Sequence, residues 1–330
     1  MNSKKKIDLL DEKLVNFNKN NWAIKLHSTE GWGEQAPCPV RFTVNPYLGC
    51  EFKCPYCYVW SDKEKTGIKP GFRESLKKGI ESAKKLNLED YVVEVSASTD
   101  PFQYIEKDKG EALYSIQRVL DAGFKVLLVT KNPSFLLEKK YLTILQNKNI
   151  FIDVTITSLK EGTPKGSILN NKGPSAKEKI RIISKLISMG KDIRVKIEPV
   201  IPTTGDIIGQ SKKDLEELVE ELAKIGVKRI IAKTLRVNAW MPEYIKKNLV
   251  TFYKDNGQLI EGNYVLNKDL RKKLLTPIYF SCKRNNITFC GCVDADVFEG
   301  IKDIVPCTIS GETLKKIRTL NETMHGCPSC

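Results

Sequence analysis

Three cysteines with the spacing C-x3-C-x2-C lie close together in one short segment: Cys50, Cys54 and Cys57. A short apolar stretch at 42–44 precedes them, so we expect them in the loop after a first strand. Thiolates hold iron–sulfur clusters, and a four-iron cluster has four metal atoms to ligate. Three thiolates from one loop leave one iron open to bind a small molecule. The spacing therefore predicts a catalytic 4Fe-4S cluster.

Three other interpretations of these cysteines are possible. A zinc site usually combines a C-x2-C pair with a second pair or with histidines downstream. Disulfides do not persist in a reducing cytosol. Buried apolar thiols would be an ordinary use of cysteine, but they have no reason to cluster so tightly. The tight spacing favours the cluster.

The composition limits the remaining classes of protein. The chain has 330 residues and ten cysteines, with 54 basic and 40 acidic residues and a net charge of +14. It contains no apolar run near the ~20 residues that span a bilayer, and no apolar segment follows the basic start as in a signal peptide. We therefore expect a cytoplasmic protein without a membrane partner, whose cysteines serve metal or redox chemistry. The basic excess favours a nucleic acid partner, although lysines spread along helices would give the same charge.

Strand and helix patterns alternate from residue 42 onward. Strands are predicted at 42–44, 91–97, 125–130, 150–157, 193–198 and 229–234, and helices near 71–86, 110–122, 133–146, 175–190 and 211–226. Six such units predict an α/β fold, a partial (β/α)6 TIM-type barrel spanning 41–237. Residues 1–40 form an N-terminal extension with a possible helix near 7–17. Residues 238–330 form a helical, cysteine-rich C-terminal region.

Polar residues alternate with apolar ones in three of the predicted strands. The polar positions are Glu94, Ser96, Ser98, Asp153, Thr155, Thr157, Arg194, Lys196 and Glu198. Strands packed between helices and a filled barrel core are apolar on both faces. The alternation therefore predicts apolar faces against the helices and polar faces lining a lumen. Functional groups of such a barrel lie at the C-terminal ends of the strands, where the cysteine loop is also expected.

Five segments carry a resemblance to a known family: 45–50 (NPYLGC), 56–58 (YCY), 98–106 (STDPFQYIE), 129–131 (VTK) and 198–202 (EPVIP). With these segments the chain resembles the radical SAM superfamily, and within it the spore photoproduct lyase-like group of proposed DNA repair enzymes. The resemblance implies a 4Fe-4S cluster that binds S-adenosylmethionine. It also implies reductive cleavage of this cofactor to a 5′-deoxyadenosyl radical, with a flavodoxin or ferredoxin as electron donor.

The resemblance also implies contacts to the cofactor. Ser98, Thr99 and Asp100 would contact its methionine part, with Thr99 as a hydrogen-bond partner. Lys131 would bind its carboxylate, as a point cation is suited to do. Glu198 would bond the ribose or adenine, or else form a salt bridge with Lys196 or Arg194.

One departure from the lyase pattern concerns the hydrogen donor. Ala97 stands where the resemblance to the lyases implies a hydrogen-donating cysteine. Another donor is then required, and Tyr58, Tyr56 or a distant cysteine are the candidates. Alternatively, either tyrosine could pack against the cluster and shield it. For Tyr56, this packing role is the favoured interpretation.

The C-terminal region contains predicted helices at 242–253 and at 267–285, the second of which is basic. A candidate second metal site comprises Cys290, Cys292, Cys307, Cys327 and Cys330. It would hold a second 4Fe-4S cluster or a zinc ion, and the final C-x2-C pair has redox activity as an alternative. His325 is a further possible ligand. Cys282 and Cys38 could instead be ordinary residues of the hydrophobic core.

These observations favour a radical SAM enzyme that repairs or modifies a nucleic acid. A second hypothesis is a radical SAM enzyme that modifies a peptide or small metabolite with an auxiliary cluster. A third is a zinc-stabilised nucleic-acid-binding module without catalysis.

Overall fold

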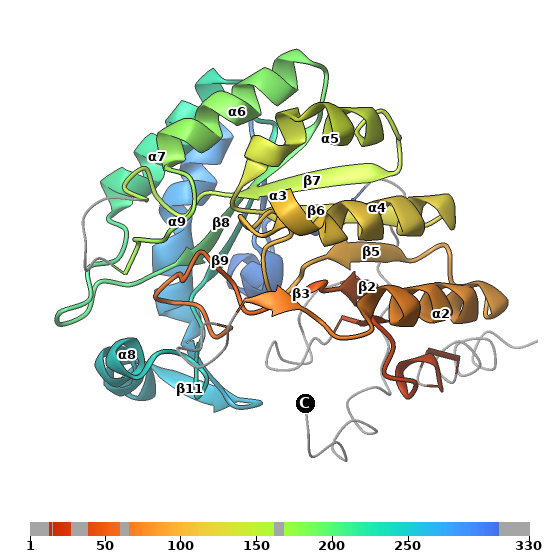
Figure 1. Cartoon of the computed structure of the whole chain (residues 1–330). Coiled ribbons are helices and arrows are strands. Elements are labelled where there is room, and N and C mark those ends of the chain that lie inside the picture. The colour runs from red at the N-terminus through yellow and green to blue at the C-terminus, as the bar shows by residue number, and fades with distance from the viewer. Residues whose placement is uncertain (1–12, 15, 28–38, 60–65, 162–167, 310–330) are drawn as a thin grey trace, which may run out of the picture.

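A curved, mostly parallel sheet forms the centre of the computed structural model, which describes residues 13–14, 16–27, 39–59, 66–161 and 168–309 (Figure 1). In spatial order its strands are β1 (Ile24–Leu26), β2 (Arg41–Val44), β5 (Val92–Val95), β6 (Lys125–Thr130), β7 (Ile150–Thr155), β8 (Ile193–Val200), β9 (Arg229–Thr234) and β13 (Thr288–Cys290). All neighbouring pairs from β2 to β13 are parallel, whereas β1 pairs antiparallel with β2. Because β1 and β13 are separate edges, the sheet is an open, partial barrel, as predicted.

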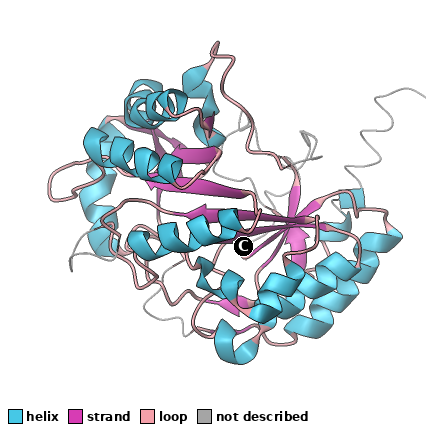
Figure 2. Ribbon diagram, turned by 90° about the horizontal axis from the view of Figure 1, so that it is seen from above, coloured by secondary structure: helices cyan, strands magenta, loops and turns pink. Residues whose placement is uncertain are grey.

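The helices that connect successive strands lie outside the sheet (Figures 1 and 2). They are α2 (Phe72–Lys85), α3 (Glu106–Lys109), α4 (Glu111–Asp121), α5 (Lys139–Ile144), α6 (Ala176–Ser188) and α7 (Lys212–Lys224). The Ser175 hydroxyl caps α6 by accepting the Glu178 N–H, and Ser211 forms a capping box with Asp214 at the start of α7.

One predicted helix differs in the structure. The range 133–146 contains a 3-10 helix, η1 (Pro133–Leu137), followed by the short α5. Glu138 between them has an extended backbone, with φ −71° and ψ 142°. The side chain of Asn132 caps η1, and Glu138 interrupts the helical hydrogen bonds, so one continuous helix is not formed.

The two faces of the sheet differ as predicted. The apolar side chains of β5, β7 and β8 are buried in one core shared with the outer helices. The opposite face carries ion pairs: Arg41 with Glu94 at 3.5 Å, and Arg194 with Asp153 at 2.6 Å. The sheet therefore encloses a lumen lined by charged groups.

The C-terminal part adds a second layer of elements. Helix α8 (Glu243–Asp255) precedes the hairpin β11 (Gly257–Ile260)–β12 (Asn263–Leu266), which pairs with β10 (Val237–Asn238). The basic helix α9 (Lys268–Arg284) leads into β13 and a 3-10 helix, η2 (Cys292–Phe298). Within the residues the structure covers, no helix is both long and apolar enough to cross a bilayer.

Candidate active site

The cysteine loop leaves the C-terminal end of β2 and is bracketed by two short antiparallel strands, β3 (Tyr47–Leu48) and β4 (Gly67–Ile68). Within it, the Cys57 N–H donates to the Cys54 carbonyl at 2.9 Å, which forms a tight turn. Cys54 is buried, and Cys50 and Cys57 are half-buried. Burial raises the pKa of both the Cys50 and the Cys54 thiol. Metal binding would release the protons of these thiols, as thiolate ligation generally does.

The donor set of the loop suits an iron–sulfur cluster, because thiolates are the usual ligands of such clusters. Over the described ranges, no group of three or more His, Cys, Asp or Glu side chains is placed to hold one metal ion. Cys50, Cys54 and Cys57 would hold this cluster.

The segment after β5 anchors the cysteine loop. The Gln103 side chain accepts the Glu51 N–H at 2.8 Å, and its amide donates to the Asp100 carbonyl at 3.0 Å. The Asp100 carboxylate accepts the Thr130 hydroxyl at 2.7 Å and the Lys131 N–H at 2.6 Å. Asp100 therefore ties the ends of β5 and β6 together, and its carboxylate is engaged by the protein's own groups.

Lys131 lies beside the cysteine loop. Its ammonium group donates to the Thr157 hydroxyl at 3.3 Å, lies 3.6 Å from the Glu161 carboxylate and 5.5 Å from the ring centre of Tyr56. Burial lowers the pKa of Lys131, but Tyr56 and Glu161 more than reverse this effect, so it lies well above the ordinary value. Lys131 therefore presents a permanent cation to the loop.

A buried ion pair stands behind Lys131. The Lys179 ammonium, on α6, lies 2.5 Å from the Glu161 carboxylate, and both side chains are fully buried. The sequence analysis missed this pair. Lys179 shares the buried face of α6 with Ala176, Ile182 and Leu186, and a lysine at such an apolar position was the available signal.

Two predicted cofactor-binding residues retain polar atoms without partners among the described residues. The buried hydroxyl oxygen of Thr99 accepts and donates no hydrogen bond there. One carboxylate oxygen of Glu198 pairs with Lys196 at 3.2 Å and with Lys233 at 3.5 Å, while the other has no partner. The salt bridge to Lys196 is confirmed. Buried polar atoms are normally satisfied, so these two suit a polar ligand.

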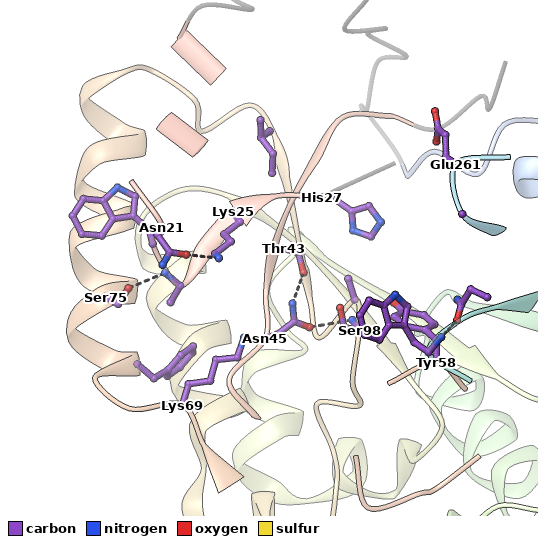
Figure 3. Close-up of a pocket in the computed structure, with 18 of the residues that line it drawn as sticks. Asn21, Lys25, His27, Thr43, Asn45, Tyr58, Lys69, Ser75, Ser98 and Glu261 are labelled. Carbon is purple, nitrogen blue, oxygen red and sulfur yellow. Dashed lines mark hydrogen bonds between the residues drawn. The ribbon is translucent and has the colours of Figure 1, made fainter. Parts of the chain in front are cut away.

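The two tyrosines of the loop have different environments. Tyr56 is buried, and its hydroxyl lies 3.1 Å from that of Thr157, which fits the packing role. Tyr58 is 50% exposed and lines a cavity together with Ala97 and Ser98 (Figure 3). Tyr58 is therefore the one of the two that faces solvent.

The cavity has a volume of about 800 Å³. Lys25, Lys69, Lys233, Trp240 and Glu261 contribute to its walls. Figure 3 shows Lys25 and His27, from the β1 segment, and Glu261, from the β11–β12 turn, around the opening. Sequence analysis did not find Lys25, Trp240 and Glu261, because they belong to segments outside the barrel core.

The cysteines of the C-terminal region are divided in the structure. Cys290, Cys292 and Cys307 pack in one buried cluster with Ile231 and Val293. Cys282 is buried elsewhere, on α9. Cys38, His325, Cys327 and Cys330 lie outside the described residues.

Comparison with known proteins agrees with this geometry. The profile of the Radical SAM superfamily matches residues 44–222. The uncharacterized protein ORF301 of Acidianus two-tailed virus is 27% identical over 256 residues, 72% of this chain and 81% of its own. The uncharacterized protein MJ0683 of Methanocaldococcus jannaschii is 26% identical over 246 residues, 71% of this chain and 89% of its own.

Among solved structures, spore photoproduct lyase complexed with dinucleoside spore photoproduct superposes with a TM-score of 0.54 at 14% identity, covering 80% of each chain. A mutant of that lyase with bound AdoMet and the dinucleoside gives 0.52 at 15% identity, over 75% of each chain. At these identities the similarity concerns the fold.

Proposed function

Because the chain belongs to the radical SAM superfamily, we propose that this enzyme acts on a nucleic acid, with the 800 Å³ cavity as the substrate site. The family implies a 4Fe-4S cluster and S-adenosylmethionine, which when bound supply an electron and a carbon-centred radical. The cavity, with its aromatic and cationic walls beside the cysteine loop, is the observation that carries the proposal.

The protein's own residues bind and orient these groups. Cys50, Cys54 and Cys57 would hold the cluster, and Lys131 would offer its cation to the carboxylate of the cofactor. The unpartnered Thr99 hydroxyl would donate or accept a hydrogen bond with a polar group of the cofactor, and the unpartnered Glu198 carboxylate oxygen would accept one. Asp100 binds none of them directly, because it fixes the backbone of Lys131.

The walls of the cavity fit a nucleobase with its phosphates. Tyr58 and Trp240 are 50% and 74% exposed and both line the cavity, so each offers an aromatic face on which a base can stack. Lys25 and Lys69 also line the cavity. Burial, and secondly the nearby charge of Lys25, lowers the pKa of Lys69. A phosphate placed there would relieve this repulsion. The fold is also that of a lyase solved with a dinucleoside.

Tyr58 is the proposed source of the hydrogen atom that quenches the substrate radical. It borders Ala97, where the resemblance to the lyases implies a cysteine, and it faces the same cavity. Transfer of the phenol hydrogen atom to the substrate radical leaves a tyrosyl radical. One electron from the flavodoxin or ferredoxin that reduces the cluster, together with one proton from solvent, restores the phenol. Tyr56 is buried against Thr157 and has no such access.

The test measures 5′-deoxyadenosine released anaerobically from S-adenosylmethionine by the reduced, reconstituted protein, with and without single-stranded DNA or RNA. We expect release to rise when nucleic acid is added. Stimulation by peptides or metabolites alone would refute the substrate class. A protein that cleaves no cofactor would instead fit a zinc-stabilised binding module.

Binding gives a second, independent readout. A Lys25→Ala/Lys69→Ala variant should bind nucleic acid more weakly, and the slope of log affinity against log salt should fall by about one for each phosphate that is no longer neutralised. Lys272→Ala/Lys273→Ala, on α9, is the matched control and should leave both quantities unchanged. If the Lys272→Ala/Lys273→Ala variant bound more weakly and the Lys25→Ala/Lys69→Ala variant did not, the nucleic acid would bind at the basic helix α9 instead.

A further inference from the structure

Three buried thiols meet on the polar side of the sheet. Cys290 ends β13, Cys292 begins η2, and Cys307 follows 15 positions later in the chain. Their side chains are 1%, 6% and 9% exposed. The Cys307 side chain is hydrogen-bonded to those of both Cys290 and Cys292. The segments from both ends of η2 thus bring three sulfur atoms together.

The backbone is shaped to achieve this convergence. Cys292 has φ +50°, a conformation that a residue with a side chain adopts only at a cost. Its N–H donates to the Cys290 sulfur at 3.4 Å. A Cβ at Gly291 would lie 2.9 Å from the Ala295 Cα, so the residue between the two cysteines has to be glycine. An unfavourable conformation held in place by tight packing indicates a functional position.

Cations surround the three thiols. The Arg41 guanidinium donates to the Cys307 carbonyl at 3.0 Å, and Arg194 donates to the Thr308 carbonyl at 2.9 Å. The Cys292 thiol is close enough to Lys196 and Lys233 to influence their ionisation. This positive environment favours an anionic group at the thiols. The charge of Glu198, which carries the unpartnered oxygen, acts on both Cys290 and Cys292.

We propose that Cys290, Cys292 and Cys307 are ligands of a second thiolate-bound metal centre in the lumen, distinct from the site of the cysteine loop. Thiolate ligands suit iron–sulfur clusters and zinc. Among the described residues, no group of three or more His, Cys, Asp or Glu side chains is yet arranged around one ion. Binding of the metal would displace the protons of these thiols.

The experiment isolates this centre from the first one. Iron, zinc and acid-labile sulfide are counted per chain in a Cys50→Ala/Cys54→Ala/Cys57→Ala protein, purified and reconstituted anaerobically. We expect either about four iron atoms with sulfide or about one zinc ion, and the two results identify the metal. A chain without metal above background would overturn the proposal. Because this variant has lost the first cluster, the outcome does not depend on the proposed function.

Single substitutions then assign the ligands. Cys292→Ser and Cys307→Ser in that background should each lower the metal content at least fivefold. Cys282→Ser is the matched control, because Cys282 is also buried in the C-terminal part but lies outside the trio, and it should leave the content unchanged. Metal that survives replacement of all three trio cysteines would place the centre elsewhere.

A measurement on the unsubstituted protein guards against misfolded variants. Alkylation of each cysteine by iodoacetamide is followed by mass spectrometry before and after chelation of the metal. The three trio cysteines should become alkylated at least tenfold faster once the metal is removed, and Cys282 should not change. Equal rates for the trio in both states would overturn the proposal.

Discussion

The buried pair of Glu161 and Lys179 allows a quantitative prediction. The Glu161 carboxylate lies 2.5 Å from the Lys179 ammonium and 3.6 Å from that of Lys131, and it accepts the Thr157 N–H at 2.8 Å. Glu161→Gln preserves the shape of the side chain and removes its charge. Lys179 is fully buried and would then have no counter-ion, whereas Lys131 keeps 14% of its side chain exposed and can reach water.

The expected loss follows from this difference. Removing one partner of a buried ion pair costs about 3–5 kcal/mol, because the other charge is left uncompensated. We therefore expect Glu161→Gln to lower the free energy of unfolding of the cluster-free protein by about that amount near neutral pH. Replacing both charges, in Glu161→Gln/Lys179→Met, should recover most of the loss, because apolar groups of similar size replace buried pairs well.

The pH dependence gives the sign of the effect. Burial acts to raise the pKa of Glu161, but Lys179 and Lys131 lower it below the ordinary value of 4.5. The stabilisation by the carboxylate is therefore fully present above pH 4.5 and is lost as pH falls through the lower, folded-state pKa. The difference between the native protein and Glu161→Gln should shrink in acid.

Anaerobic guanidinium unfolding, followed by circular dichroism, measures these values. Glu111→Gln is the matched control: Glu111 is a buried carboxylate, but its partner Arg73 is 55% exposed and can be hydrated. We expect the control to cost less than about 1 kcal/mol. If Glu161→Gln cost no more than Glu111→Gln, or if the double variant were as unstable as the single one, the reasoning would be wrong.

Four further substitutions test the active site and the lumen. Lys131→Met should weaken anaerobic binding of S-adenosylmethionine by about 10–100-fold in calorimetry, because a charged hydrogen bond contributes ~1.5–3 kcal/mol; unchanged affinity would remove Lys131 from the cofactor site. Tyr58→Phe should release 5′-deoxyadenosine while product per deoxyadenosine falls at least tenfold in chromatographic assays, whereas Tyr56→Phe should keep that ratio and lose about 1 kcal/mol of stability. Gly291→Ala should cost about 1–3 kcal/mol in thermal unfolding, because its Cβ meets Ala295, and a neutral result would show that the turn can relax.

The barrel was predictable because its elements are long and periodic. Strands such as β6 and β7 and helices such as α6 and α7 show clear apolar repeats with caps or glycines at their ends. Strands β1 and β13 were missed, since each has three residues and exists only by pairing with a neighbour in the folded sheet. Local sequence carries little information about such strands.

The candidate site was predictable only in part, for a similar reason. The cysteine loop and the residues at 98–100 and 131 lie in contiguous motifs. The structure brings these segments together at the C-terminal ends of neighbouring strands. Lys25, Trp240 and Glu261 come from three distant segments, and they share a cavity only after the chain has folded. Glu161 gave no local signal, because its partner Lys179 is 18 residues away on another element.

The hydrogen bond between Arg41 and the Cys307 carbonyl joins residues 266 positions apart. During synthesis on the ribosome, β2 to β9 therefore emerge, and their helices can cover the apolar face, long before this segment exists. Until it arrives, Arg41 and Arg194 have their carboxylate partners Glu94 and Asp153, and the N–H groups that later bond the carbonyls of residues 307 and 308 must be hydrated. Contacts so distant in sequence form slowly, so the last step of folding should be the closing of the charged face by residues 305–309. A nascent chain halted shortly before that segment would carry a nearly complete sheet with an open, wet interior, accessible to proteases and to metal delivery.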